Sequence, residues 1–350
     1  MKKICIIYAN CQNRLLAECL SKSTLFNQEY LIKRFPAHLL IQGKKTIPEQ
    51  ILKKAKLFIY QPVKEVHGKA SSEYILSQLS PDCQTISFPS LYFTGYFPQH
   101  YKKPNKRIVK SIYPFGIIPE GDLNVANMLE QGQNPNQIIE QLQHQDFYTS
   151  EFLRANVDSS LAELARRESS LDIKVSQFIR DNYQQQRLFY VHNHPTDILG
   201  FYITNLILNK INLPQFDTQD LAANPAAGIL DNTQVPIYPS VIKHLQLSFT
   251  QNITYKHNRF CTNNLTFERY IQEYINLDQL VTGSSGGFYF AGIKHLAKNK
   301  YSLAEKSLKE AIKINPQNAA YYRELGKVYE QQQQLDRAEL VYKKAISISP

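Results

Sequence analysis

The sequence has 350 residues, of which 43% are hydrophobic and 20% charged, and its formal net charge is +10. This length suits one large domain and a smaller one, and the absence of any run of about 18 apolar residues excludes a membrane-spanning helix. The positive charge favours an anionic partner, but no long Lys/Arg run or nucleic-acid motif is present, so phosphate-bearing small molecules and anionic lipid surfaces are equally open.

The first ninety residues alternate between short apolar runs and amphipathic segments. Strands are predicted at 4–8, 30–32, 57–60 and 85–88, and helices at 14–21, 48–55 and 72–79. This alternation predicts βαβ units and a doubly wound, mainly parallel sheet of the α/β class. The first apolar run is short and meets Asn10 and Gln12 instead of a small-residue cleavage site, so we expect no signal peptide.

The middle of the chain is mainly helical. Helices are predicted at 123–131, 135–143, 150–169 and 175–182, followed by a strand that returns at 188–191 and a helix at 198–211. The stretch 212–263 is rich in Asn, Pro and Gln and has little pattern, and one more helix is predicted at 265–277. We therefore assign residues 1–280 to one α/β domain with a helical insertion.

The C-terminal region repeats with a period of 34 residues. Eight positions of the first repeat match eight of the second, among them Gly292 with Gly326, Ala304 with Ala338, and Pro316 with Pro350. The pattern resembles tetratricopeptide repeats, in which small residues let paired helices approach closely. We predict a linker at 281–287 and two all-α repeats at 288–350, with a groove for a protein partner.

Five cysteines, an odd number, are spread along the chain without any CxxC spacing: Cys5, Cys11, Cys19, Cys83 and Cys261. This distribution favours reduced thiols over a disulfide framework or a zinc site. We expect a cytoplasmic protein with no nucleic-acid partner and no metal.

Cys11 lies between the first predicted strand and the first predicted helix. Free backbone N–H groups and the helix dipole at such a place favour a thiolate, and the same N–H groups could hold an oxyanion. The alternative is a small buried thiol, which we expect for Cys5 and Cys19. The polar neighbours Asn10 and Gln12 favour a functional role for Cys11.

Two histidines follow the strand predicted at 188–191. A cysteine nucleophile needs a nearby base, so His192 or His194 could serve, oriented by Asp197 or Asn193. The segment could instead be only the start of a helix, with Thr196 or Asp197 capping its free N–H groups. A metal site is a third alternative, but no further ligand is apparent and we do not predict one.

Five short motifs follow one another along residues 2–211: Asn10-Cys11-Gln12, Tyr60-Gln61-Pro62, Phe88-Pro89-Ser90 with Gly95-Tyr96, Leu188-Phe189-Tyr190, and His194-Pro195. Their order and spacing resemble the WcbI-type polysaccharide biosynthesis family. The resemblance implies a fold related to SGNH hydrolases and a coenzyme A-binding acetyltransferase of capsular or cell-surface polysaccharide synthesis. It also implies that Cys11 is the catalytic thiol and that Gln12, Gln61 and His194 line the same pocket.

The candidate site combines both lines of reasoning. We predict three catalytic residues, Cys11, His194 and Asp197. We predict five residues that bind coenzyme A or acetyl-CoA as a substrate: Asn10, Gln12, Arg14, Gln61 and His192. Further cations that could meet the phosphates of coenzyme A are Lys64, Lys102, Lys103 and Lys106.

The predicted reaction moves an acyl group from coenzyme A to a sugar hydroxyl. In one version Cys11 carries the acyl group as a thioester, and in another it positions the donor while His194 deprotonates the acceptor. Two alternatives remain: an SGNH-like esterase or deacetylase, in which water replaces the sugar, and a scaffold that presents the repeats to partners.

Overall fold

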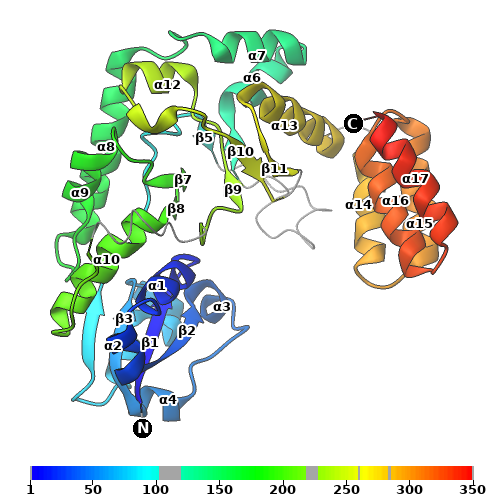
Figure 1. The fold of residues 1–350 in the computed structure, drawn as a ribbon. Coiled ribbons are helices and arrows are strands. Elements are labelled where there is room, and N and C mark those ends of the chain that lie inside the picture. The colour runs from blue at the N-terminus through cyan, green and yellow to red at the C-terminus, as the bar shows by residue number, and fades with distance from the viewer. Residues whose placement is uncertain (1, 102–119, 218–227, 259–260, 283–284, 349–350) are drawn as a thin grey trace. The chain divides into compact units, whose positions relative to one another are not determined.

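The computed structural model describes residues 2–101, 120–217, 228–258, 261–282 and 285–348. Figure 1 shows the elements in chain order. The chain divides into two compact units, the first made of 1–100, 140–258 and 262–266, the second of 101–139, 259–261 and 267–350. The second unit thus takes in the segment 101–139, which the sequence placed in the α/β domain. No helix within the described ranges is long and apolar enough to cross a membrane.

The first unit contains a four-stranded parallel sheet of order β2-β1-β3-β4. Its strands are β1 (Lys3–Ala9), β2 (Tyr30–Pro36), β3 (Ala55–Tyr60) and β4 (Gln84–Ser87). All four predicted strands are present, which confirms an α/β fold with a parallel sheet. The strand order changes direction between β1 and β3, and ligands of such sheets bind beyond the strand ends at this switch point.

Helices follow β1, β2 and β3 along the chain. They are α1 (Gln12–Leu20), α2 (Thr24–Glu29), α3 (Ala37–Ile41), α4 (Glu49–Lys54), the 3-10 helix η1 (Glu65–Ala70) and α5 (Ser72–Ser77). Alternate residues of β1 and β3, Ile6 and Phe58 among them, pack against Leu52 of α4 and Ile75 of α5. These side chains are buried and form the core on one face of the sheet.

Helix α1 packs against the long helix α10 (Asp197–Lys210). A glycine makes the close approach possible, because a Cβ at Gly200 would lie 2.8 Å from Cδ1 of Leu15 and 3.0 Å from Sγ of Cys19. Leu15, Cys19 and Phe201 belong to the same buried cluster. The polar loop after β1 therefore leads directly into α1, which is fixed in place by its close packing against α10.

The remaining elements of the first unit come from the middle of the chain. They are α8 (Ser150–Glu168), α9 (Ser176–Asn182), β7 (Phe189–Val191), β8 (His194–Pro195), β9 (Thr233–Gln234), α12 (Pro239–His244), the 3-10 helix η2 (Ser248–Thr250), β10 (Tyr255–His257) and β11 (Cys261–Leu265). Strands β11, β10 and β9 form a second, three-stranded sheet. Helix α8 is capped by Thr149, whose hydroxyl accepts the N–H of Phe152 at 3.2 Å.

The strand predicted at 188–191 does not return to the parallel sheet, which corrects our expectation. It is β7, and it pairs antiparallel with β8 through only two intervening residues, His192 and Asn193. A parallel partner would need a crossover connection of a dozen residues or more, whereas two residues suffice for a hairpin. His192 and His194 therefore lie at and next to the tip of a hairpin.

The second unit is helical. Its elements are α6 (Leu123–Glu130), α13 (Phe267–Thr282), α14 (Gly286–Leu296), α15 (Tyr301–Ile314), α16 (Ala319–Gln331) and α17 (Leu335–Ile348), with β6 (Gly121–Asp122) before them. Strand β5 (His100–Tyr101) and helix α7 (Pro135–Gln143) lie at the unit boundaries. The backbone N–H of Asp122 donates to the hydroxyl of Tyr274 at 2.9 Å, which links the segment before α6 to α13.

The four C-terminal helices pair as the 34-residue period predicts. A Cβ at Gly292 would lie 2.6 Å from Cγ of Leu308, and one at the equivalent Gly326 would lie 2.3 Å from the ring of Tyr342. Ala304 and Ala338, at the crossing of each pair, are buried. Two helical hairpins built on the same small-residue contacts confirm the predicted repeats.

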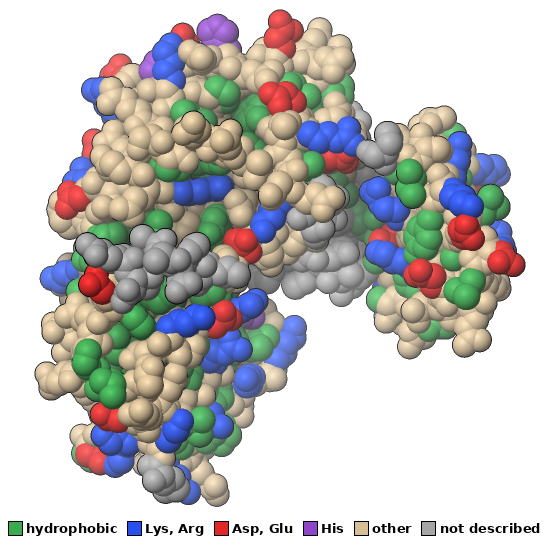
Figure 2. Space-filling model, viewed as in Figure 1, with side chains coloured by type: hydrophobic (Ala, Val, Ile, Leu, Met, Phe, Trp, Pro, Cys, Tyr) green, Lys and Arg blue, Asp and Glu red, His purple; other side chains and the backbone are tan. Residues whose placement is uncertain are grey.

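Charged side chains are mixed over the visible face of the protein. In Figure 2, Lys and Arg side chains lie among acidic and uncharged ones and form no continuous basic stripe on this face. Many of the cations are ion-paired on the surface, such as Lys53 with Glu49 and Arg180 with Asp158. The net charge of +10 therefore does not gather into one large basic surface on the face shown.

Candidate functional site

The candidate site lies where β1 and β3 end. Past the ends of the two strands, the backbone N–H of Gln61 donates to the carbonyl of Tyr8 at 2.9 Å, and the N–H of Asn10 donates to Oε1 of Gln61 at 3.0 Å. Two of the predicted site segments, Asn10–Gln12 and Gln61, therefore meet at the switch point. Their meeting follows from parallel strands whose carboxyl ends share one edge.

Gln12 holds three segments together and is only 1% exposed. Its Nε2 donates to the carbonyl of Leu91 at 2.8 Å and to that of Asn193 at 2.9 Å. Its Oε1 accepts from the N–H of Leu91 at 3.1 Å and from Nε2 of Gln61 at 2.7 Å. Because both ends of its amide are occupied, Gln12 fixes the loops around the site, and the turn between β7 and β8 is fixed against the Cys11 loop.

Cys11 occupies the N-cap position of α1 and is partly exposed. Burial raises the pKa of its thiol, and hydrogen bonds from the backbone N–H groups of Cys11 and Gln12 lower it by less. The expected preference for the thiolate is therefore wrong: the helix terminus acts in the expected direction, but desolvation outweighs it. Burial raises the pKa of Cys5 and Cys19 much further, as suits structural thiols.

Two N–H groups at the start of α1, those of Gln12 and Asn13, are already engaged, which leaves them less available to an oxyanion. Oδ1 of Asn10 accepts the N–H of Gln12 at 2.8 Å, and the carbonyl of Asn10 accepts the N–H of Asn13 at 3.1 Å. The same Oδ1 lies 3.9 Å from Sγ of Cys11. The side chain of Asn10 therefore binds the first N–H group of α1 and contacts the thiol, so it lies at the centre of the site.

The two histidines of the turn have different surroundings. The ring of His192 stacks on that of His100 with centroids 3.5 Å apart, and the ring of Tyr92 meets it edge-on at 4.9 Å. The carbonyl of His192 accepts the N–H of Phe93 at 2.7 Å. His194 is partly exposed and opens β8, opposite Val191. Because Gln12 binds the intervening Asn193, both histidines are held beside the Cys11 loop.

Asp197 is the first residue of α10 and is 9% exposed. Its Oδ1 accepts the N–H of Ile229 at 3.3 Å, and burial raises its pKa to about 6, with the charge of Asp231 adding to the effect. The capping alternative does not hold for Thr196, whose hydroxyl donates to the carbonyl of Arg187 at 2.9 Å. Asp197 is therefore a buried, easily protonated carboxyl at the base of the hairpin.

The predicted phosphate-binding cations lie in several places. Arg14 is exposed on α1, and its Nε pairs with Oε1 of Glu18 at 2.6 Å. Lys64 is exposed in the loop after β3. The other three, Lys102, Lys103 and Lys106, lie outside the described residues. Arg14 is thus near the site along the chain, but a carboxylate of its own helix already pairs with it.

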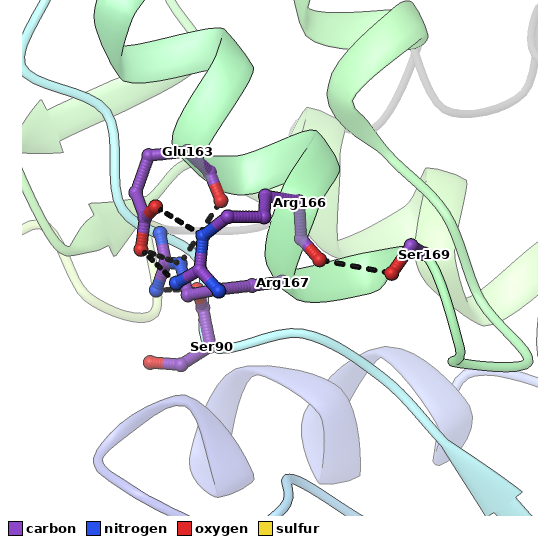
Figure 3. A network of polar contacts seen from close by, with 5 residues as sticks. All are labelled: Ser90, Glu163, Arg166, Arg167 and Ser169. Atoms are coloured by element: carbon purple, nitrogen blue, oxygen red, sulfur yellow. Dashed lines mark hydrogen bonds and ion pairs between the residues drawn. The ribbon is translucent and has the colours of Figure 1, made fainter.

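The sequence did not point to Ser90 as a hydrogen-bonding residue or to Arg167 at all. Nδ2 of Asn10 donates to the hydroxyl of Ser90 at 3.0 Å, and Nη1 of Arg167 donates to the carbonyl of Ser90 at 3.2 Å. Figure 3 shows Arg167 reaching from α8 to Ser90, with Glu163 and Arg166 beside it. The available signal was the spacing of Asn156, Ser160, Glu163 and Arg167, which places polar residues on one face of α8.

Comparisons with known proteins find similarity to one family of enzymes and to one kind of repeat. The family model described as the polysaccharide biosynthesis enzyme WcbI matches residues 4–216, and a tetratricopeptide repeat model matches residues 291–350. A search of curated proteins finds no match. A solved structure of WcbI, described as a polysaccharide biosynthesis enzyme without a disulfide bond between coenzyme A and one of its cysteines, is similar with a TM-score of 0.62.

That similarity covers 89% of this chain and 99% of the solved chain at 20% sequence identity, so by itself it shows the fold. The family model covers more than half of the 350 residues and spans the Cys11 loop, Gln61 and the β7–β8 turn. The chain belongs to the WcbI family of polysaccharide biosynthesis enzymes and carries tetratricopeptide repeats at its C-terminal end.

Proposed function

We propose that this protein transfers an acyl group, acetyl in the simplest case, from coenzyme A to a sugar hydroxyl during capsular or cell-surface polysaccharide synthesis. Family membership supports the role in polysaccharide biosynthesis, and the similar WcbI structure is described together with coenzyme A. The observation that carries the proposal is the amide of Gln12, which joins the Cys11 loop to Asn193 between the two histidines. The turn that carries two imidazoles is thereby fixed beside the loop that carries the thiol.

In the direct route, His194 is the general base. It takes the proton of the acceptor hydroxyl while the sugar oxygen attacks the thioester carbonyl. The tetrahedral intermediate then collapses, the C–S bond breaks, and the coenzyme A thiolate leaves and receives the proton from His194. The raised pKa of Cys11 supports this route, because a thiol that keeps its proton can position the donor without attacking it.

In the covalent route, His194 first takes the proton of Cys11. The sulfur attacks the thioester, and coenzyme A leaves with that proton, so the acyl group becomes a thioester on Cys11. The sugar hydroxyl, deprotonated by His194, then attacks this second thioester and restores the thiol. Intact mass spectrometry after incubation with acetyl-CoA separates the routes: an acetyl adduct that Cys11→Ser abolishes indicates the covalent one.

Calorimetric titration with coenzyme A tests the function itself. The wild-type protein should bind coenzyme A, and a ligand at a hundredfold excess over its Kd should raise the free energy of unfolding by about 2.7 kcal/mol. Cys11→Ser should keep most of the affinity but lose transfer in the covalent route. Cys83→Ser is the matched control, since Cys83 lies before β4 and should change neither property.

Absence of coenzyme A binding at millimolar concentration would overturn the proposal and favour the hydrolase or the scaffold. A hydrolase uses water and does not need coenzyme A.

We further propose that the repeats bind a protein partner, because paired helices of this kind supply a groove for peptides and proteins. Other enzymes of the same polysaccharide pathway are the partners we expect.

A further inference from the structure

One polar face of α8 runs along the loop that follows β4. The hydroxyl of Ser160 accepts the N–H of Thr94 at 3.0 Å, and Nδ2 of Asn156 donates to the carbonyl of Thr94 at 2.9 Å. At the other end of the loop, Arg167 donates to the carbonyl of Ser90. These contacts come from residues spaced by about one or two helical turns, so α8 fixes the loop along its length and delivers Arg167 to a defined place.

Arg167 is connected to the thiol of Cys11 through two hydrogen-bonding residues, Ser90 and Asn10. Its Nη1 binds the carbonyl of Ser90 at 3.2 Å, and the hydroxyl of Ser90 accepts from Nδ2 of Asn10 at 3.0 Å. Oδ1 of Asn10 lies 3.9 Å from Sγ of Cys11. The guanidinium also lies close enough to Tyr92 to lower the pKa of its phenol, against the larger effect of burial. Arg167 thus lies in the neighbourhood of both Cys11 and the ring that packs on His192.

The charges around Arg167 do not balance. Arg166 holds Glu163 in a bidentate pair at 2.8 and 2.9 Å, whereas Nε of Arg167 lies 3.4 Å from the same carboxylate. Two guanidinium groups and one carboxylate leave one positive charge (Figure 3). The side chain of Arg167 is 30% exposed, and the Ser90 and Glu163 contacts use two of its five N–H groups.

We propose that Arg167, supported by Arg166, binds a phosphate group of the thioester donor beside Cys11. A planar guanidinium with free N–H groups matches phosphate oxygens in a bidentate fashion, and partial burial strengthens the contact. This inference rests on the proposed use of coenzyme A. It adds a phosphate-binding residue on α8, a helix from which the sequence predicted no ligand contact.

An ordinary structural role has to be distinguished from this one. Cations in the last turn of a helix stabilise its dipole, and Arg166 and Arg167 lie in the last turn of α8. Lysine satisfies the dipole equally well, but it cannot replace a bidentate guanidinium. Arg167→Lys therefore separates the two roles, and Arg180→Gln, which removes an exposed cation from α9, controls for net charge.

The experiment titrates the full chain with three probes: coenzyme A, dephospho-coenzyme A and pantetheine, which lacks the diphosphate and the 3′-phosphate. Arg167→Gln and Arg167→Lys should each weaken coenzyme A binding on the order of tenfold, as expected for one lost charge-assisted contact. Pantetheine binding and the affinity of Arg180→Gln should stay as in the wild type. If the Arg167 variants bind dephospho-coenzyme A more weakly than the wild type by the same factor as coenzyme A, Arg167 binds the diphosphate. If they bind dephospho-coenzyme A as tightly as the wild type does, Arg167 binds the 3′-phosphate.

Two results would overturn the assignment. Either Arg167 variants bind coenzyme A as the wild type does, or they lose the same factor with pantetheine, which would mean that Arg167 only shapes the Ser90 loop. If the wild-type protein itself binds no coenzyme A, the proposed function fails instead, and that result is read from the first titration. The two failures are therefore distinguishable.

Discussion

The candidate site is built from contacts between residues far apart in the sequence, whereas the repeats are built from contacts between residues close together in the sequence. Gln12 and Asn193, whose hydrogen bond closes the site, are separated by 181 positions in the sequence. In the repeats, Gly292 faces Leu308 and Gly326 faces Tyr342, each within one helical hairpin. A site assembled from distant segments depends on the whole first unit, whereas the closest contacts of the repeats lie within single helical hairpins. The two regions should therefore respond differently to single substitutions.

The largest effect is expected at the histidine next to the turn. His194→Ala should lower the transfer rate by about 10²–10⁴-fold, as expected for a lost general base. The rate can be followed as coenzyme A release in the presence of a saccharide that the wild-type protein acylates. His192→Ala removes the stacking with His100 and should change donor affinity more than rate. Equal and small losses at both positions would contradict the assigned base.

A second test removes the hydrogen bonds by which Gln12 joins distant segments of the chain. Gln12→Leu keeps the volume but leaves the backbone groups of Leu91, the carbonyl of Asn193 and the amide of Gln61 without this partner. Unsatisfied buried groups cost about 1–3 kcal/mol each, so the free energy of unfolding should fall by about 3 kcal/mol or more, and coenzyme A binding should weaken with it. Urea denaturation and calorimetry measure both.

Gln185→Leu is the matched control for that substitution, because Gln185 is exposed in the same unit. It should change stability by less than about 0.5 kcal/mol, as is usual for surface positions. A Gln12→Leu protein as stable as this control would show that the hydrogen bonds of Gln12 are dispensable for joining the distant segments.

The same contrast in range explains what could be predicted from the sequence. Asn10, Gln12 and Gln61 follow directly after predicted parallel strands, so their meeting at one edge could be foreseen. The repeats could be predicted because small residues recur at a fixed spacing along the sequence. The contact of Arg167 with Ser90 could not be foreseen, because it depends on how α8 lies against the loop after β4.

Two errors have the same origin. The burial of Cys11 comes from segments that cover it in the folded chain, and this burial reverses the pKa shift expected from the helix terminus alone. The strand predicted at 188–191 pairs with β8 and not with the parallel sheet, because an apolar run predicts a strand but not its partner. Local patterns therefore indicated which residues belong to the site, and tertiary packing decided their chemistry.

A smaller effect is expected when a local contact of the repeats is overpacked. The Cβ of Gly326→Ala would meet the ring of Tyr342 at 2.3 Å, so the ring has to move and the hairpin should lose about 1–2 kcal/mol. Gly287→Ala is the control, since its Cβ meets nothing within 4 Å. Thermal unfolding should report the loss, while coenzyme A affinity stays unchanged. Loss of coenzyme A binding in the folded variant would contradict the proposed separation of the repeats from the site.

The smallest effect concerns the buried carboxyl at the start of α10. The pKa of Asp197 is raised to about 6, chiefly by burial, so the folded state holds this proton more tightly than the unfolded chain does. Between about pH 4 and pH 6 the folded chain therefore binds more protons than the unfolded one, and the contribution of Asp197 to stability falls as the pH rises. Above about pH 6 the full penalty of a buried carboxylate is present.

Asp197→Asn removes that penalty and keeps an oxygen that can accept the N–H of Ile229. One pKa unit corresponds to about 1.4 kcal/mol, and the buried amide NH₂ offsets part of the gain, so we expect the variant to be more stable by about 1 kcal/mol at pH 7.5. Near pH 4 the gain should disappear, because the wild-type carboxyl is then protonated in the folded state. Urea unfolding at the two pH values measures the difference within one pair of proteins. A variant that is less stable than the wild type at pH 7.5 would contradict the burial penalty and show that the fold stabilises the carboxylate of Asp197.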